Sequence, residues 1–175
     1  MARKVSETET SAFVDKPINV NRVTKVTKGG KRFSFSALVI SGDRQGKAGI
    51  GVGKSREASS AIAKATARAR KSMIKIPLRG TTIPYPVTGR HGSSTVIIRS
   101  AYKGTGVIAG GAVRLVMDAL GIKDVLAKSI GSSNKQNVVK ATFNALAKLR
   151  SAQSIAALRG KTIETLVRGE NVATK

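Results

Sequence analysis

Residues 48–55, which read AGIGVGKS, constrain the possible fold more than any other stretch of the chain. Apolar side chains alternate with glycine there, and a period of two predicts a β-strand with one face bare of side chains. Residues 57–73 follow with alanine at helical spacing. We therefore expect Ala48 to face inward on a strand, Ser55 to cap a helix, and this alanine-rich helix to pack close to the sheet.

Two more strands are predicted before this one. Residues 19–28 and 32–41 alternate or run apolar, and glycine-containing turns separate the successive strands. The turns read KGGK and GDRQG, which are sequences typical of the connections between antiparallel strands. Residues 17–80 are therefore expected to form a three-stranded antiparallel sheet followed by one helix.

A second unit is predicted for residues 81–150. Three of the four prolines mark the connection to it, and residues 83–88 have the character of a strand. Further along, the apolar patterns predict a strand at residues 94–102, a helix that ends before Gly121, a strand at residues 123–130 and a helix at residues 134–150. The order β-β-α-β-α gives a two-layer unit, so the expected fold class of the whole chain is α+β.

The two ends of the chain are patterned more weakly. Residues 1–16 are polar and are expected to form a flexible arm without the apolar core of a secretory signal. Residues 151–175 are expected to form a C-terminal extension that is helical in part. Because no apolar run approaches the ~20 residues of a membrane-spanning helix, we expect no membrane span.

Charge is the strongest global property of the chain. It carries 32 Lys and Arg against nine Asp and Glu, a formal net charge of +23. Between residues 17 and 116 the only acids are Asp43 and Glu57. Such an excess repels itself unless a polyanion is present, so nucleic acid is the first candidate partner and an acidic membrane surface the second.

The candidate RNA-binding residues belong to the first unit, because a meander followed by a helix is also the construction of a double-stranded-RNA-binding domain. Such domains bind phosphates through a helix start and read the shape of the RNA. The candidates on the first hairpin are Arg22, Lys25, Lys28, Lys31 and Arg32. Around the expected helix start they are Lys47, Lys54, Ser55 and Arg56, and on the helix Lys64, Arg68, Arg70 and Lys71.

Two motifs suggest a nucleotide enzyme as an alternative. GVGKS resembles a P-loop, but that pattern requires glycine at Ala48 and a parallel sheet. Residues 104–109 match a relaxed dinucleotide fingerprint, but Asp124 stands at the start of the next strand instead of its end. His91 is the only histidine, cysteine is absent, and no carboxylates are paired in the sequence. We therefore expect no catalytic residue, no metal and no cofactor.

Residues 20–73, from VNRVTKVTKGGKRF to ARARKSM, and residues 104–146, GTGVIAGGAVRLVMDALG to KATFNAL, together identify a family. They closely resemble bacterial small-subunit ribosomal protein five, and the match covers about residues 17–150. The resemblance implies a double-stranded-RNA-binding-like first domain and a non-enzymatic protein of the cytoplasmic ribosome. A free regulatory protein that binds double-stranded RNA stays open as a further alternative.

The resemblance also implies partners. The family binds ribosomal RNA where the head of the small subunit meets the body, contacts small-subunit proteins four and eight, contributes to translational accuracy and lies near the channel through which mRNA enters. Residues 24–32, with Gly29 and Gly30 at the turn, correspond to its spectinomycin-associated loop, which contacts RNA. Residues 104–114 correspond to the segment that faces protein four. The candidate interface residues there are Gly104, Gly106, Gly110, Gly111 and Arg114.

Overall fold

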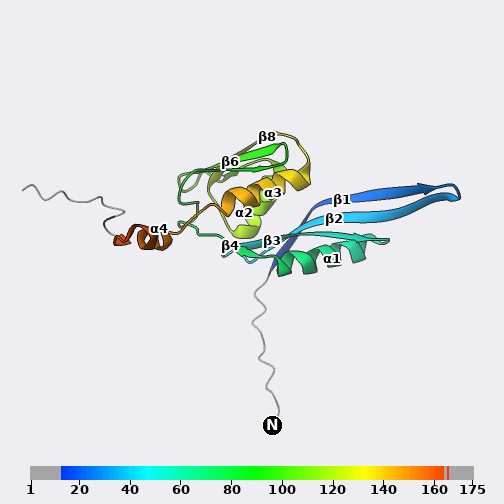
Figure 1. The fold of residues 1–175 in the computed structure, drawn as a ribbon, viewed down its shortest axis with the longest axis horizontal. Coiled ribbons are helices and arrows are strands. Elements are labelled where there is room, and N and C mark those ends of the chain that lie inside the picture. The colour runs from blue at the N-terminus through cyan, green and yellow to red at the C-terminus, as the bar shows by residue number, and fades with distance from the viewer. Residues whose placement is uncertain (1–12, 164, 166–175) are drawn as a thin grey trace, which may run out of the picture.

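The structure is a computed structural model that describes residues 13–163 and residue 165. Figure 1 shows two sheets with helices packed on them and a long two-stranded hairpin that extends beyond the rest of the molecule. The first sheet contains β1 (Val14–Thr27), β2 (Gly30–Gly42), β3 (Lys47–Ser55) and β4 (Ile74–Lys75), with α1 (Ala58–Lys71) packed on it. The second sheet contains β5 (Val87–His91), β6 (Ser94–Ser100), β7 (Val107–Ile108) and β8 (Val125–Gly131). The remaining helices are α2 (Gly111–Leu120), α3 (Lys135–Leu146) and α4 (Ala152–Arg159).

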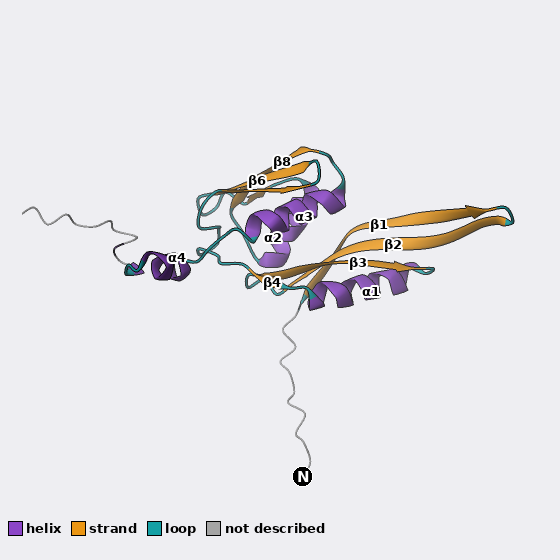
Figure 2. Cartoon of the chain, in the orientation of Figure 1, coloured by secondary structure: helices purple, strands orange, loops and turns teal. Residues whose placement is uncertain are grey.

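The two sheets differ in topology (Figure 2). The first sheet has the order β1-β2-β3-β4 and is antiparallel throughout. The second has the order β5-β6-β8-β7, in which the short β7 runs parallel to β8. The helix α3 packs on β5 and β6. The expected α+β class is confirmed, as is the antiparallel meander with one helix followed by a β-β-α-β-α unit.

Several boundaries differ from the sequence prediction. β1 begins at Val14, so residues 14–16 are part of a strand and not of the flexible arm to which we assigned them. The first sheet has a fourth strand, β4, which is two residues long. β5 begins at Val87 and not at residue 83. Ile83 lies in the connection that precedes the strand, where it is fully buried. The pattern also missed β7, since two residues are too few to show alternation.

The ion pairs of two successive charged residues explain why β1 begins so early. Successive side chains of a strand point to opposite faces of the sheet. The Asp15 carboxylate accepts a hydrogen bond from Arg70 Nη2 of α1 at 2.7 Å. On the other face, Lys16 Nζ lies 3.2 Å from Asp118 Oδ2 of α2. The start of β1 is thus attached to one helix on each side.

One face of β3 is made of glycine and touches the backbone of α1 directly. A methyl group at Gly49, Gly51 or Gly53 would lie 2.1, 2.0 or 2.1 Å from a carbonyl oxygen of the helix. These carbonyl groups belong, in the same order, to Ala69, Ala65 and Ala61, which are fully buried. Because neither surface carries a large side chain, helix and sheet approach more closely than side chains would allow.

The other face of the first sheet packs on the second half of the chain. Ile40 of β2 and Ala48 of β3 are fully buried in the same hydrophobic cluster as Met117 and Leu120 of α2. That Ala48 faces inward is therefore confirmed. The cluster continues through the second half to α3 and its sheet, with Val96, Ile98, Val125, Val139 and Leu146 among its members. The two units are joined by one core and not by a hinge of few contacts.

The turn between β2 and β3 also binds the end of α2. The backbone N–H groups of Arg44 and Gly46 donate to the carbonyl groups of Ala119 and Leu120, each at 3.0 Å. Gly121 ends the helix with φ of 82°, as predicted from its position. A methyl group at Gly121 would lie 2.1 Å from the Arg44 carbonyl oxygen, so glycine is required there for space as well as for its φ.

A buried carboxylate closes the glycine loop that precedes α2. Asp124 Oδ1 accepts hydrogen bonds from the N–H groups of Gly104 at 2.9 Å and Gly106 at 3.1 Å, and 4% of the residue is exposed. Gly104 and Gly106 have φ of 94° and 78°, values that favour glycine. A side-chain hydrogen bond with Thr81, then the Gly106 N–H, lower the pKa of Asp124, against the effect of burial. These contacts occupy the amides that a dinucleotide would need.

Gly51→Ala tests the contact between β3 and α1. The added methyl group has no space against Ala65, and overpacking of this kind costs about 1–3 kcal/mol of unfolding free energy. Urea denaturation followed by circular dichroism measures the loss. The control is Gly111→Ala in α2, where a methyl group meets no atom within 4 Å and a helix favours alanine. Equal stability of the Gly51→Ala variant and the wild type would contradict the packing.

Asp124→Asn tests the carboxylate at the glycine loop. Because the pKa of Asp124 is lower in the folded protein than the ordinary value of about 3.9, the charged carboxylate stabilises the fold above that pH. The stabilisation is lost as the pH falls through the folded-state pKa. We expect the wild type to exceed Asp124→Asn in urea midpoint near neutral pH, and the difference to shrink below about pH 4. A difference independent of pH would contradict the role of the charge.

Candidate nucleic-acid interface

The projecting hairpin of β1 and β2 carries the first group of predicted residues. Arg22, Lys25, Lys28, Lys31 and Arg32 are all exposed there. Lys25 stands directly opposite Arg32 on the neighbouring strand, and like charges in that position destabilise a sheet. A bound anion removes the cost of this repulsion, so the pair indicates a surface that faces negative charge.

The tip of the hairpin has a specific geometry. Gly30 has φ of 134°, a value that L side chains rarely adopt, and Thr27 Oγ1 donates to its carbonyl group at 3.1 Å. Gly29 shows no such constraint, and a methyl group on it would meet no atom within 4 Å. Nearer the base, the Arg22 guanidinium lies 3.8 Å from the centre of the Phe33 ring, which holds this charge across the hairpin.

A second group lies on α1. Lys64, Arg68 and Lys71 are exposed at a spacing that places them on one side of the helix. Arg68 Nη1 donates to the Val52 carbonyl group at 2.7 Å, so this side chain lies against β3. Arg70 points to the other side, where it binds Asp15 and lies 5.4 Å from the Phe13 ring centre. Both guanidinium groups keep donors free for another ligand, because each has five N–H groups.

The group expected around the helix start does not assemble there. Ser55 is the last residue of β3, paired with Phe35, and the N-cap of α1 is Glu57. Our prediction that Ser55 caps the helix was therefore wrong. The Glu57 carboxylate accepts from Ser60 Oγ at 3.0 Å and places a negative charge where a phosphate was expected. Arg56 is exposed between these residues.

Two lysines of that group lie elsewhere. Lys54 follows Gly53, which faces α1, so alternation directs Lys54 to the opposite face of the sheet. Lys47 begins β3, about 24 Å from Lys54 along the strand. It stands directly opposite Lys75 of β4. Lys47 and Lys75 thus form a second pair of like charges, near the C-terminal end of α1.

The glycine-rich segment GVGKS does not form a nest for phosphates. Residues 48–55 pair in unbroken register with β2, so their backbone takes part in strand pairing. The glycine face is filled by α1. This geometry excludes the P-loop alternative at this segment.

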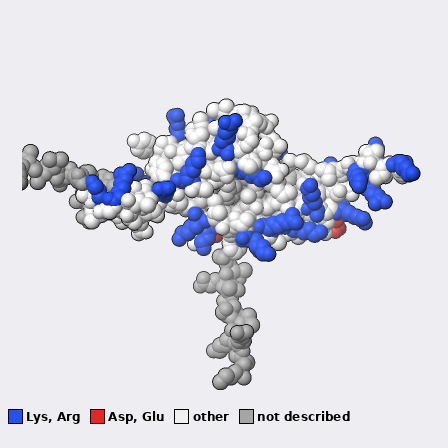
Figure 3. All heavy atoms as spheres, viewed as in Figure 1, with Lys and Arg blue, Asp and Glu red and all other residues white. Residues whose placement is uncertain are grey.

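Among the described residues, acids form an ion pair with one of these bases, Arg70, which is bound by Asp15. In residues 13–163 and 165 there are five carboxylates, and every one has a partner inside the protein. They are Asp15, Asp43, Glu57, Asp118 and Asp124. Asp43, for example, accepts from the N–H groups of Gln45 and Lys47. Figure 3 shows Lys and Arg side chains over α1 and over the hairpin tip, with few acidic atoms among them.

The second predicted surface, residues 104–114, forms a loop, the short β7 and the first turn of α2. Gly104, Gly110 and Gly111 are exposed and Gly106 is half-buried. Arg114 is exposed at the N-terminal end of α2, where a helix dipole disfavours a positive charge and where no acidic residue occurs. Ile108 within this segment and Tyr102 just before it are also exposed. Neither was among the predicted residues, because single exposed apolar residues carry no pattern.

Within residues 13–163 and 165, no three His, Cys, Asp or Glu side chains gather as a metal site would require. The same residues contain no helix of the length and hydropathy that a membrane crossing needs.

Comparison with known proteins agrees with the resemblance found in the sequence. The family model of the ribosomal protein S5 N-terminal domain matches residues 13–77, and that of the ribosomal protein S5 C-terminal domain matches residues 89–159. A small ribosomal subunit protein uS5 of Lawsonia intracellularis is 53% identical over 152 residues, 87% of this chain and 93% of the relative. One of Acidithiobacillus ferrooxidans is 52% identical over 172 residues, 97% of each chain. That name describes a ribosomal component and not an enzyme, as expected. With both domain models matched in order and such relatives covering nearly its whole length, the chain belongs to the family of small ribosomal subunit protein uS5.

Proposed function

We propose that this small-subunit ribosomal protein binds ribosomal RNA where the head of the subunit meets the body, through the first sheet and α1. One observation carries the proposal. The described carboxylates are all bound within the protein, while Lys25–Arg32 and Lys47–Lys75 stand as pairs of like charge on adjacent strands. RNA phosphates would supply the missing negative charge, and release of their counterions would drive the binding.

The RNA contacts are proposed to follow the shape of the backbone more than its sequence. The hairpin would insert its tip, residues 24–32, between RNA strands, and α1 would lie along a backbone with Lys64 and Lys71. The same tip is proposed to be the loop that affects the response to spectinomycin. Lys54 would serve a separate contact, because it points away from α1. The other predicted residues act with these: Arg22, Lys28, Gly29, Gly30, Lys31, Lys47, Arg56, Arg68 and Arg70.

The second unit is proposed to contact proteins. Residues 104–114 would face small-subunit protein four, with protein eight as a further neighbour, and this contact would influence translational accuracy near the channel through which mRNA enters. We assign RNA binding to residues 17–80 and protein contacts to residues 81–150, with residues 1–16 and 151–175 as terminal segments. The shared core between the units supports a rigid link from RNA to protein partner. This role places the protein in the cytoplasmic ribosome.

Removing the like-charged pair of the hairpin tests the RNA contact. For the wild type we expect the logarithm of the affinity for small-subunit ribosomal RNA to fall with the logarithm of salt concentration with a slope of about −5 or steeper. Lys25→Gln/Arg32→Gln should weaken binding and make the slope less steep by about two, one for each lost phosphate contact. Filter-binding titrations over a range of salt concentrations measure both quantities.

The matched control is Lys128→Gln/Arg159→Gln, which removes the same charge from exposed positions in β8 and α4. If the control changes affinity and slope as much as the hairpin variant does, then net charge and not the hairpin determines binding. A flat salt response of the wild type would contradict the proposal itself.

Arg114→Glu tests the protein interface. Reversing this exposed charge at the start of α2 should weaken the contact with protein four, and we expect a severalfold change in misreading. The measurement is near-cognate misincorporation by small subunits reconstituted with the variant. Arg159→Glu in α4 makes the same charge reversal away from the segment and serves as the control. An unaltered misreading rate in fully assembled Arg114→Glu subunits would remove Arg114 from the interface.

A further inference from the structure

Tyr102 has the highest exposure of the large hydrophobic side chains in the described part of the chain, at 93%. A single exposed aromatic residue is ordinary by itself. Tyr102, however, also forms one wall of an open cavity of about 520 Å³, a volume in the range of ligand-binding sites.

The exposed ring stands on an anchored backbone. The Ala101 N–H group donates to Thr82 Oγ1 at 3.3 Å, and the Thr105 N–H group donates to the Tyr102 carbonyl group at 3.2 Å. The glycine loop that follows Tyr102 is held by Asp124, which accepts hydrogen bonds from two of its N–H groups. The backbone around Tyr102 is therefore fixed before any partner arrives, which lowers the entropic cost of binding to it.

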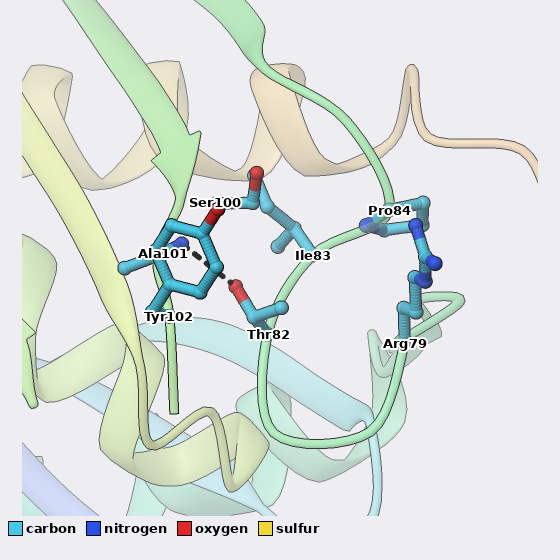
Figure 4. Close-up of a pocket in the computed structure, with 7 residues that line it drawn as sticks. All are labelled: Arg79, Thr82, Ile83, Pro84, Ser100, Ala101 and Tyr102. Atoms are coloured by element: carbon cyan, nitrogen blue, oxygen red, sulfur yellow. Dashed lines mark hydrogen bonds between the residues drawn. The ribbon is translucent and has the colours of Figure 1, made fainter. Parts of the chain in front are cut away.

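The lining of the cavity combines three kinds of group (Figure 4). Tyr102 provides an aromatic face on one side, and Arg79 provides a guanidinium on the other. Ile83 and Pro84 contribute apolar surface, and Ser100 contributes a hydroxyl group. Arg79 is held in a tight turn, because its N–H group donates to the Thr82 carbonyl group at 2.8 Å and its own carbonyl group accepts in return.

The charge around the cavity is positive. Arg79 lines the cavity, and the exposed Lys103 follows Tyr102 in the chain. Among the described residues the nearby carboxylate is that of Asp124, which is buried and directed into the glycine loop. A ligand with a negative charge and a flat unsaturated ring fits this combination.

We infer that the cavity beside Tyr102 binds one unpaired nucleotide of RNA, with its base stacked on the tyrosine ring and its phosphate held by Arg79. Aromatic side chains bind the exposed bases of single strands in this way, and a guanidinium binds phosphate in bidentate fashion. A base within a duplex is covered by its neighbours and cannot stack on the ring. The inference rests on the proposed RNA-binding function and adds to it a second site, on the other unit, for single strands.

The site is tested by measuring how two labelled RNAs bind to the full chain and to variants that keep its net charge. Fluorescence anisotropy at moderately high salt measures binding of a short adenylate oligonucleotide and of an RNA duplex. Tyr102→Ala should weaken the oligonucleotide complex about tenfold, the value of one stacked base, and leave the duplex complex unchanged within about twofold. Tyr102→Phe keeps the ring and should bind as the wild type does. Ile130→Ala removes another exposed apolar side chain and should change neither affinity.

The outcomes separate this site from the proposed function. If the wild type binds both RNAs and Tyr102→Ala retains full affinity for the oligonucleotide, the nucleotide site is wrong while RNA binding through the hairpin stands. Equal losses in Tyr102→Phe and Tyr102→Ala would also overturn it, because stacking would not be the contact. Full oligonucleotide affinity combined with poor incorporation of Tyr102→Ala into subunits would assign the cavity to a protein partner. Failure of the wild type to bind either RNA would overturn the proposed function as well.

Discussion

Burial of the first sheet on both faces is the constraint on which the rest of the structure depends. On one face, three glycines of β3 let the backbone of α1 rest against the strand. On the other, Ile40 and Ala48 join the core built around α2. Both contacts fix the position of the same three strands, so neither helix can shift without disturbing the other side of the sheet.

This fixed sheet gives a definite direction to the hairpin that continues from it. Ion pairs of Asp15 and Lys16 attach the base of the hairpin to α1 and α2, whereas its outer part carries an excess of exposed bases. Individual surface ion pairs contribute only about 0–1 kcal/mol, so their main effect is on where β1 begins. The described acids thus serve the fold, and the remaining bases are left for a polyanion. A protein built this way suits a particle in which RNA is the neighbour.

Local sequence patterns predicted the helices and strands better than they predicted which residues lie close together in the folded chain. The meander, the alanine-rich helix, the end of α2 at Gly121 and the order of the second unit follow from periodicity and turn residues. The candidate site was harder, because Lys47 and Lys54 are near in sequence but lie about 24 Å apart along an extended strand. Ser55 looked like a cap, yet strand pairing with Phe35 continues through it and moves the helix start to Glu57.

The sequence by itself determined the class of fold, the basic character of the hairpin and the family, because these depend on composition, period and long continuous motifs. Only the tertiary structure decided which face of each strand is covered and which charges meet. The glycine face of β3, the pairing of Lys47 with Lys75, and the cavity between Tyr102 and Arg79 all join residues through contacts between separate segments. Such contacts follow from the packing of the whole chain, and no local pattern encodes them.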